Sequence, residues 1–199
     1  MLLPSIEKEI KHMYEARIIA LIRFSEWVSN LVPTRKKTGE IRLCVDLRNV
    51  NKVSLKDNYP LPKMDHIFQG VVGSSRISLL DGFLGYNQIL VHPDGQEKNS
   101  FTTPWGTFMY LKMPFGLKNA GETFQRAMDI AFSKEIHDCL VVYLDDITVF
   151  FKSDQQHLDH LRQVFLKCRK YGIYLNPNKS LFGLEEGKLL VHIISKYGI

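Results

Sequence analysis

The feature that most constrains this chain is an acidic pair, Asp145-Asp146, placed between two apolar runs. Residues 140–142 precede the pair and residues 147–151 follow it, with Tyr143 and Leu144 leading directly into it. Two runs rich in β-branched residues around a short polar break predict a β-hairpin with the carboxylates at its tip. Because this turn offers no Gly or Asn, we expect a bulky or acidic residue to adopt an uncommon backbone conformation there. The alternative is an ordinary surface turn, in which Asp is frequent.

The composition is that of an ordinary globular protein. The chain has 199 residues, of which 45% are hydrophobic and 24% are charged. No apolar run approaches the length of a membrane-spanning helix, and the apolar start is too short for a signal peptide. The three cysteines, Cys44, Cys139 and Cys168, are widely spaced and odd in number, which favours buried thiols over disulfides. We therefore expect an intracellular, cytoplasmic protein that is not secreted and has no membrane partner.

The net charge of +5 is concentrated in the N-terminal part of the chain. From Arg35 to Lys52 the sequence has six basic residues, including Lys37 and Arg42, against two acidic ones. Such a patch suits a polyanionic partner, either a nucleic acid or a nucleoside triphosphate. The alternative is a solvated charged hairpin without a ligand.

Hydrophobic periodicity predicts a mixed α+β chain. Strands are expected at 41–45, 77–80, 87–91, 107–112, 172–175 and 188–194, and helices after Ser5, Asn119 and Ser153 and just before Gly73. In the second half, the order strand, helix, hairpin, helix, strand matches a split β-α-β sheet, ferredoxin-like, with helices on one face. His157 and His160 lie three residues apart without a paired Cys motif, so we do not expect a zinc site.

Three acidic residues end or join apolar strands: Asp81, Asp145 and Asp146. Neighbouring strands of the expected sheet would bring Asp81 beside the hairpin tip. Clustered carboxylates repel one another, and the repulsion should raise the pKa of at least one of them unless cations neutralise the cluster. Carboxylate oxygens favour Mg²⁺, and two such ions about 4 Å apart can align a 3′-hydroxyl and a triphosphate for in-line displacement.

Four segments together resemble the motifs of retroelement reverse transcriptases, in that family's order and at its spacing. They are Val-Asp-Leu-Arg-Asn-Val-Asn-Lys at 45–52, Ser-Leu-Leu-Asp-Gly-Phe-Leu-Gly-Tyr-Asn-Gln at 78–88, Met-Pro-Phe-Gly-Leu-Lys-Asn-Ala at 113–120 continuing to Gln125, and Tyr-Leu-Asp-Asp at 143–146. The resemblance covers almost the whole chain, which is similar to the polymerase of plant Gypsy-type long-terminal-repeat retrotransposons. It implies an RNA-directed DNA polymerase that adds deoxynucleoside triphosphates to a primer on an RNA or DNA template, with two Mg²⁺ ions, or Mn²⁺ in their place.

The resemblance also implies roles for individual residues. Asp81, Asp145 and Asp146 would be catalytic and would hold the metal ions, with Asp146 the less direct ligand. The incoming nucleotide would be bound by Lys37, Arg42, Phe83, Tyr86, Phe115, Gly116 and Lys179. The nucleic acid would contact Arg48, Gln125, Tyr143 and His192. The alternatives are a solvated loop lysine at Lys179 and a packing aromatic at Tyr86.

By the same resemblance the chain is a right-hand polymerase fragment, with fingers at 1–55 and 91–114 and a palm at 56–90 and 115–199. A thumb, a connection and an RNase H domain are expected to be absent, as in a fragment or decayed copy of a polyprotein, and the family suggests a virus-like particle as the location. The sequence departs from the family at Gly121, where Pro is usual, and at Val191, where Gly is usual. Two other functions stay open: a nucleic-acid-binding remnant without turnover, and another right-hand polymerase, against which Tyr86 argues.

Overall fold

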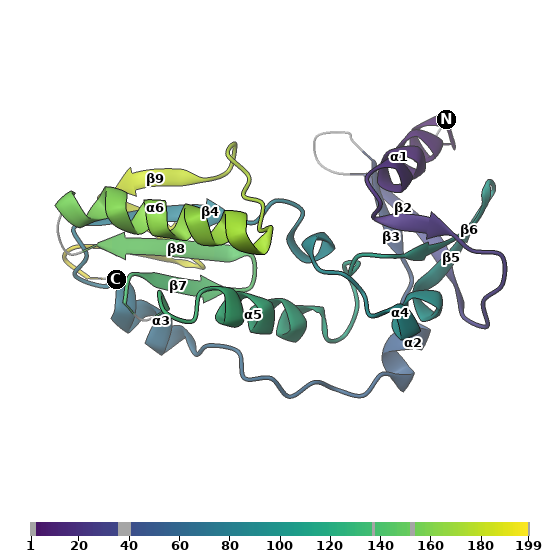
Figure 1. Cartoon of the computed structure of the whole chain (residues 1–199), viewed down its shortest axis with the longest axis horizontal. Coiled ribbons are helices and arrows are strands. Elements are labelled where there is room, and N and C mark those ends of the chain that lie inside the picture. The colour runs from purple at the N-terminus through teal and green to yellow at the C-terminus, as the bar shows by residue number, and fades with distance from the viewer. Residues whose placement is uncertain (1–2, 36–40, 137, 152–153, 199) are drawn as a thin grey trace. The chain divides into compact units, whose positions relative to one another are not determined.

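The computed structural model of the chain describes residues 3–35, 41–136, 138–151 and 154–198 (Figure 1). The chain divides into two compact units, each built from two segments. Unit 1 comprises Met1–Asp57 and Tyr86–Ala120, and unit 2 comprises Asn58–Gly85 and Gly121–Ile199. In the described part of the chain, no helix combines the length and the apolar character needed to cross a membrane.

Unit 1 is a five-stranded sheet packed against its first helix. The strand order is β1-β6-β5-β2-β3, with β2 and β5 parallel and the other pairs antiparallel. The apolar face of the first helix, Ile6, Ile10 and Met13, packs with Phe101 and Phe108 in one core. The elements are α1 (Leu3–Glu15), β1 (Ile19–Leu21), β2 (Val28–Arg35), β3 (Ile41–Val45), α2 (Arg48–Val53), α4 (Pro93–Gln96), η2 (Glu97–Asn99), β5 (Ser100–Thr103) and β6 (Gly106–Tyr110).

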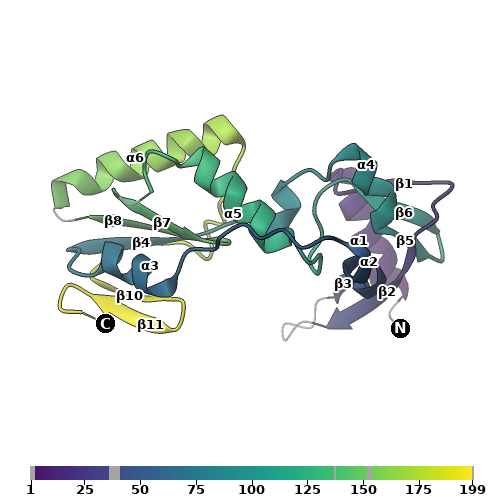
Figure 2. The same ribbon diagram turned by 90° about the horizontal axis from the view of Figure 1, so that it is seen from below.

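Unit 2 is a four-stranded antiparallel sheet of order β7-β8-β4-β9 with a separate β10–β11 hairpin. Figure 2 shows α5 and α6 on one side of this sheet and α3 with the β10–β11 hairpin on the other. The elements are α3 (Met64–Val71), β4 (Arg76–Asp81), α5 (Ala120–Ala131, which begins at the boundary), β7 (Leu140–Tyr143), β8 (Asp146–Phe151), α6 (Asp154–Tyr171), β9 (Leu181–Leu184), β10 (Glu186–Leu189) and β11 (His192–Ser195).

Both faces of the unit 2 sheet are covered by other elements, because successive side chains along each strand point to opposite faces. Phe68 and Val71 of α3 pack on the face that carries Ile77, Val141 and Phe150, together with the hairpin residues. The opposite face belongs to α5 and α6, the two helices of the second half that were predicted to share one face, whereas α3 lies on the other side of the sheet (Figure 2). Because β7 and β8 are apolar at nearly every position, both faces have to be covered.

Several local predictions are confirmed and several are wrong. The strand at 41–45, the helix before Gly73, the strand leading into Asp81 and the helix predicted after Ser153 are present. Gly73 and Gly172, which follow the two helices, have positive φ. Ser5 lies inside α1, not at its cap, and Ser153 lies outside the described residues.

Each wrong strand prediction lies next to or includes residues with positive φ, namely Leu84 and Gly85, Gly172 and Leu190. Residues 85–88 form the 3₁₀ helix η1 (Gly85–Gln88), and beyond it Leu90 makes only an isolated bridge to Lys112. The apolar run expected as one strand at 188–194 is two strands, because Leu190 adopts φ +56° and reverses the chain. Residues 172–175 contribute only an isolated bridge at Leu175, and strand β5 lies in a segment for which no strand was predicted.

The unit boundaries differ by a few residues from the predicted subdomain boundaries. Val91 N–H donates to the Leu111 carbonyl (2.9 Å) and Met113 N–H to the Ile89 carbonyl (2.8 Å), which places residues 86–90 in unit 1. The 114–119 segment is likewise bonded to residues 51–57 of the same unit, as described below.

Candidate active site

Backbone pairing brings the three predicted carboxylates together in unit 2. Strands β4 and β8 are antiparallel with Asp81 opposite Asp146, and β7 pairs with β8 so that Tyr143 also lies opposite Asp146. Asp145 occupies the tip between β7 and β8, and its carbonyl oxygen accepts the Gly82 N–H at 3.0 Å. The predictions of a hairpin here and of Asp81 beside it are therefore confirmed.

The tip of this hairpin is turned by Leu144, which has φ +54°. A bulky residue rarely adopts this left-handed conformation, because its Cβ then crowds the backbone. The expectation of a bulky or acidic residue in an uncommon conformation is confirmed at Leu144. Such strain persists where surrounding contacts hold it, and here a buried glutamine supplies them.

That glutamine is Gln125 of α5, whose side chain is 0% exposed. Its Oε1 accepts the Leu144 N–H at 2.9 Å, and its Nε2 donates to the Val142 carbonyl at 3.1 Å and to Asp129 Oδ1 at 3.0 Å. Gln125 thus lies behind the hairpin, with its side-chain amide bonded inside unit 2. Its role in nucleic-acid binding stays a prediction.

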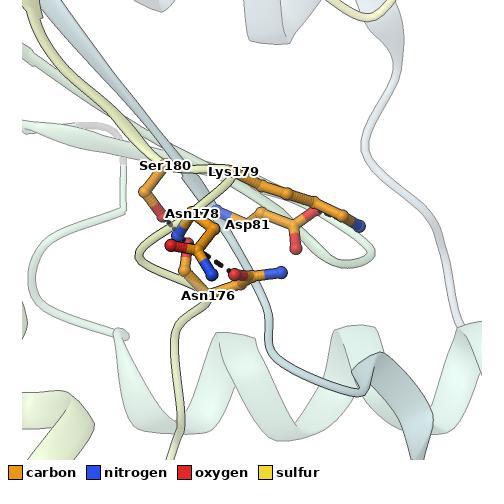
Figure 3. Close-up of polar contacts among 5 residues, drawn as sticks. All are labelled: Asp81, Asn176, Asn178, Lys179 and Ser180. Atoms are coloured by element: carbon orange, nitrogen blue, oxygen red, sulfur yellow. Dashed lines mark hydrogen bonds and ion pairs between the residues drawn. The ribbon is translucent and has the colours of Figure 1, made fainter.

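On the other side of Asp81, the loop at 176–180 forms a compact turn (Figure 3). Asn176 N–H donates to the Asp81 carbonyl at 2.8 Å, and Ser180 Oγ accepts the Asp81 N–H at 3.2 Å while donating to the Asn176 carbonyl at 2.7 Å. Asn178 N–H donates to the Asn176 side chain at 3.1 Å. These bonds fix the end of β4 and carry Lys179 to the carboxylate.

Lys179 Nζ lies 3.5 Å from Asp81 Oδ2. The ammonium group is mostly exposed, so this ion pair adds little to stability. The pair does place a positive charge beside the carboxylates, where it could bind a phosphate group of a substrate. The structure thus brings Lys179 to the site, as predicted, whereas its role there stays a prediction.

The carboxylate cluster shifts the titration of Asp146. Its pKa is raised, first because surrounding protein reduces the hydration of its carboxyl group, then because Asp145 and Asp81 add negative charge, and Lys179 acts in the opposite direction. Asp146 nevertheless keeps contact with solvent at the strand end. The direction agrees with the predicted rise of a carboxylate pKa in this cluster, although burial is a larger cause than the predicted repulsion.

The carboxylate oxygens of Asp81, Asp145 and Asp146 are suitable ligands for a hard cation. Carboxylate oxygens on adjacent strand ends repel one another, and a divalent ion would relieve that repulsion. In the side-chain conformations of the described residues, however, no group of three His, Cys, Asp or Glu side chains is already arranged as a metal site. Asp81 and Asp146 both line a cavity of about 420 Å³, together with Lys179, Lys188 and Leu190.

The raised pKa of Asp146 makes its negative charge destabilising in the metal-free fold. A carboxyl group that titrates higher in the folded chain than in the unfolded chain lowers stability as the pH rises above its ordinary value of 3.8, and the loss is complete above the raised pKa. We expect Asp146→Asn to raise the thermal unfolding midpoint of the metal-free chain at neutral pH, and to have no such effect well below pH 3.8. Asp159→Asn, on the exposed face of α6, is the matched control and should change the midpoint at neither pH. A midpoint for Asp146→Asn equal to or below that of wild type at neutral pH would contradict this account.

Three predicted nucleotide-binding residues lie together in unit 1. The rings of Tyr86 and Phe115 pack at 5.1 Å between centroids, and Gly116 has φ +96°, which a residue with a Cβ adopts only under strain. Asn51 holds this loop, because its Nδ2 donates to the Gly116 carbonyl and its Oδ1 accepts the Lys118 N–H, both at 2.7 Å.

Asn119 makes two further hydrogen bonds between the 113–120 motif and an earlier segment of the chain. Its Oδ1 accepts the Asp57 N–H at 3.1 Å and its Nδ2 donates to the Leu55 carbonyl at 2.7 Å. Two side-chain amides thus bond the 113–120 motif to the 45–52 motif and to the segment that follows it. Asn51 was not among the residues predicted from the sequence. The available signal was its amide, which can donate to a carbonyl and accept from an N–H at the same time.

The remaining predicted residues are divided between the two units. Phe83 is exposed in unit 2, and its N–H donates to the Tyr174 carbonyl at 2.8 Å. Arg42 is exposed on β3, whereas Lys37 lies outside the described residues. His192 is exposed at the start of β11 with its ring 4.9 Å from that of Phe68.

Arg48 makes a forked ion pair with Asp46. Its Nε and Nη2 donate to Asp46 Oδ1 at 2.8 Å and Oδ2 at 2.6 Å, and this pairing lowers the pKa of Asp46 to about 2. The charge predicted to meet nucleic acid is therefore partly neutralised within its own motif.

The cysteines and the histidine pair complete the predictions. Cys139 and Cys168 are buried free thiols, and burial raises the pKa of each to about 11; Cys44 is only half-buried. His157 and His160 pack against the Phe151 ring, with centroid distances of 4.0 and 5.6 Å.

Comparison with known proteins agrees with this geometry. Residues 34–194 match the family model described as "Reverse transcriptase (RNA-dependent DNA polymerase)". The chain is 37% identical over 200 residues to the Retrovirus-related Pol polyprotein from transposon 412 of Drosophila melanogaster, covering 98% of this chain and 16% of that protein. It is 33% identical to the corresponding polyprotein from transposon gypsy of the same species, over 97% of this chain and 19% of the relative.

The chain is also similar in sequence to a viral polyprotein and in fold to solved reverse transcriptase structures. The Enzymatic polyprotein of Cauliflower mosaic virus (strain CM-1841) is 31% identical over 94% of this chain and 30% of its own length. The foamy viral protease-reverse transcriptase dRH, solved in complex with double-stranded DNA, superimposes with a TM-score of 0.89 at 22% identity, over 98% of this chain and 34% of that one. The chain thus spans less than a third of the length of these three polyproteins. From the match over residues 34–194 and the carboxylates that β4 and β8 bring together, we conclude that this chain belongs to the reverse transcriptase family, as a domain of the kind found in retrotransposon Pol polyproteins.

Proposed function

We propose that the chain is the fingers and palm of an RNA-directed DNA polymerase, which adds deoxynucleotides to a primer 3′-hydroxyl as directed by a template. The observation that carries the proposal is the register of β4 on β8, which sets Asp81 opposite Asp146 beside Asp145 at the hairpin tip. Unit 2 would be the palm and unit 1 the fingers. Relatives solved with double-stranded DNA or with an RNA/DNA hybrid support a nucleic-acid substrate.

Asp81 and Asp145 would hold divalent ions, with Asp146 the less direct ligand. Reverse transcriptases generally use divalent ions, and we propose two Mg²⁺ ions, for which Mn²⁺ can substitute. When bound, such ions would neutralise the triphosphate and activate the attacking hydroxyl. Lys179, 3.5 Å from Asp81 Oδ2, would meet the outgoing phosphates once a cation occupies the carboxylates.

The other residues would position the two substrates. Phe83, Tyr86, Phe115 and Gly116 would contact the nucleotide, and the Asn51 bonds would keep the loop that carries Gly116 in place. Tyr143 and His192 would contact the primer or template, joined by Arg48 if it leaves Asp46. Lys37 and Arg42 would bind the triphosphate.

Replacing Arg42 tests the triphosphate assignment. An exposed guanidinium on β3 can fork onto phosphate oxygens, whereas alanine cannot. We expect Arg42→Ala to raise the nucleotide KM or lower kcat, with kcat/KM falling about tenfold, the loss of one charge-assisted hydrogen bond. Arg35→Ala, on the adjoining strand β2, is the control for general loss of charge. Unchanged steady-state kinetics for Arg42→Ala would return this residue to a solvated surface role.

A second function is a nucleic-acid-binding remnant without turnover. Val191, 73% exposed in the turn between β10 and β11, favours it, because a glycine is usual there in the family. An intracellular, cytoplasmic location and an origin in a plant Gypsy-type element are further parts of the proposal. The free cysteines support the location, and the motifs at 78–88 and 113–125 support the origin.

Primer extension decides between these two functions. The purified chain is incubated with Mg²⁺, deoxynucleoside triphosphates and a DNA primer on an RNA template, and binding of the same duplex is followed by fluorescence anisotropy. The polymerase proposal predicts both binding and a lengthened primer. Binding without extension would instead support the remnant.

A further inference from the structure

A chain of buried and half-buried polar side chains runs behind the catalytic hairpin, entirely within unit 2. It begins at Leu144, whose N–H donates to Gln125 Oε1 at 2.9 Å, and continues from Gln125 Nε2 to Asp129 Oδ1 at 3.0 Å. Asp129 Oδ2 then accepts the Tyr59 hydroxyl at 2.6 Å. Four residues from three separate segments are thus linked by three hydrogen bonds.

Asp129 and the Val142 carbonyl together determine which end of the Gln125 amide faces the Leu144 N–H. An ionised carboxylate can only accept hydrogen bonds, so it requires the amide nitrogen of Gln125. The Val142 carbonyl makes the same demand at 3.1 Å. With the nitrogen between two acceptors, the amide oxygen is left for Leu144 N–H; an inverted amide would set oxygen against oxygen.

Tyr59 in turn fixes Asp129. Tyr59 lies two residues into unit 2, where the chain has just left unit 1, and it is half-buried. The Arg126 guanidinium lies 4.6 Å from the centre of its ring, a cation–π contact with the same side chain. The bond to Asp129 is also the first cause of a raised pKa for Tyr59, so the phenol stays protonated and able to donate.

We propose that Tyr59 and Asp129 are positioning residues for the catalytic hairpin, because together they orient the Gln125 amide that holds the backbone of Leu144. The hairpin needs such support, because Leu144 keeps a left-handed conformation next to Asp145. The consequence for catalysis rests on the proposed function, whereas the consequence for the hairpin does not. Neither residue touches the reacting groups.

Hydrogen exchange of the Leu144 amide tests the proposal without requiring activity. In ¹⁵N-leucine-labelled protein, Tyr59→Phe removes one hydroxyl and retains the ring. We expect the Leu144 amide to exchange about 3–10-fold faster, as for one weakened hydrogen bond, with Leu80 and Leu161 unchanged. Tyr197→Phe, which removes a hydroxyl from a side chain that is 96% exposed, should change none of the three.

A second variant and a kinetic readout complete the test. Asp129→Asn can present a donor to Gln125 and should accelerate exchange at Leu144 in the same way. In the active enzyme both variants should lower kcat while the nucleotide KM stays unchanged, because they loosen the carboxylate hairpin without touching the nucleotide loop. Unchanged exchange at Leu144, or equal acceleration at Leu80 and Leu161, would overturn the proposal. If the wild-type protein does not extend a primer, the proposed function is refuted. Hydrogen exchange at Leu144 then still decides whether Tyr59 and Asp129 position the hairpin.

Discussion

Asp145→Asn is expected to abolish primer extension while leaving the fold intact. The change is nearly isosteric, and the Asp145 carbonyl still accepts the Gly82 N–H. What is lost is one negative ligand where a divalent ion would neutralise charge in the transition state, a contribution of several kcal/mol. Because each 1.36 kcal/mol of activation free energy changes a rate tenfold, the rate of single-turnover extension should fall on the order of 10³-fold or more. Asp81→Asn, at the end of β4, should have an effect of similar size.

A control variant distinguishes the loss of a metal ligand from the loss of the folded structure. Asp159→Asn removes the same charge from the exposed face of α6 and should extend primers at the wild-type rate. Circular dichroism and thermal unfolding of all three variants should show the wild-type fold. Activity within a few fold of wild type in either Asp145→Asn or Asp81→Asn would refute the metal assignment.

Tyr86→Val is expected to raise the use of ribonucleotides relative to deoxyribonucleotides. Tyr86 lies five residues after Asp81, where the family motif puts a ring under the sugar of the incoming nucleotide. A ring there would occupy the space that a 2′-hydroxyl needs and would reject the wrong sugar by a clash. Removing the ring should change the ratio of kcat/KM values for the two sugars by about 10–100-fold, the size of discrimination by pocket shape. Deoxyribonucleotide use should fall less than ribonucleotide use rises.

Tyr86→Phe is the matched control, because it keeps the ring and its packing on Phe115. It should keep the wild-type sugar preference, measured by single-nucleotide incorporation with each triphosphate. Phe115→Leu, which loosens the same ring pair, should lower both efficiencies together. An active Tyr86→Val enzyme with an unchanged sugar preference would show that Tyr86 is only a packing aromatic.

The strands that carry the carboxylates could be predicted from the sequence, because the pattern of apolar residues around each carboxylate specifies them. Apolar runs around Asp145 specify a hairpin, and the apolar run before Asp81 specifies a neighbouring strand, so the register of the carboxylates follows from burying both strands. Even the strained residue could be anticipated, because the turn has no glycine to supply the positive φ that Leu144 adopts.

What could not be predicted depends on contacts between distant segments. Leu190 turns the chain inside an apolar run, and its positive φ has no signature in its own side chain. Gln125 looks like a polar helix residue until the fold buries it behind the hairpin, and Asn51 bonds to a loop 65 residues away. Hydrogen-bond partners of this kind are set by tertiary packing, which periodicity does not encode.

The most direct test of the central claim is single-nucleotide addition on four RNA templates that differ only in the first unpaired base. Wild-type chain and Asp145→Asn are compared on the same primer with Mg²⁺, one deoxynucleoside triphosphate at a time. The account predicts that wild type adds only the complementary nucleotide on each template and that Asp145→Asn adds none above background. Addition that ignores the template base, or addition by both proteins alike, would contradict it.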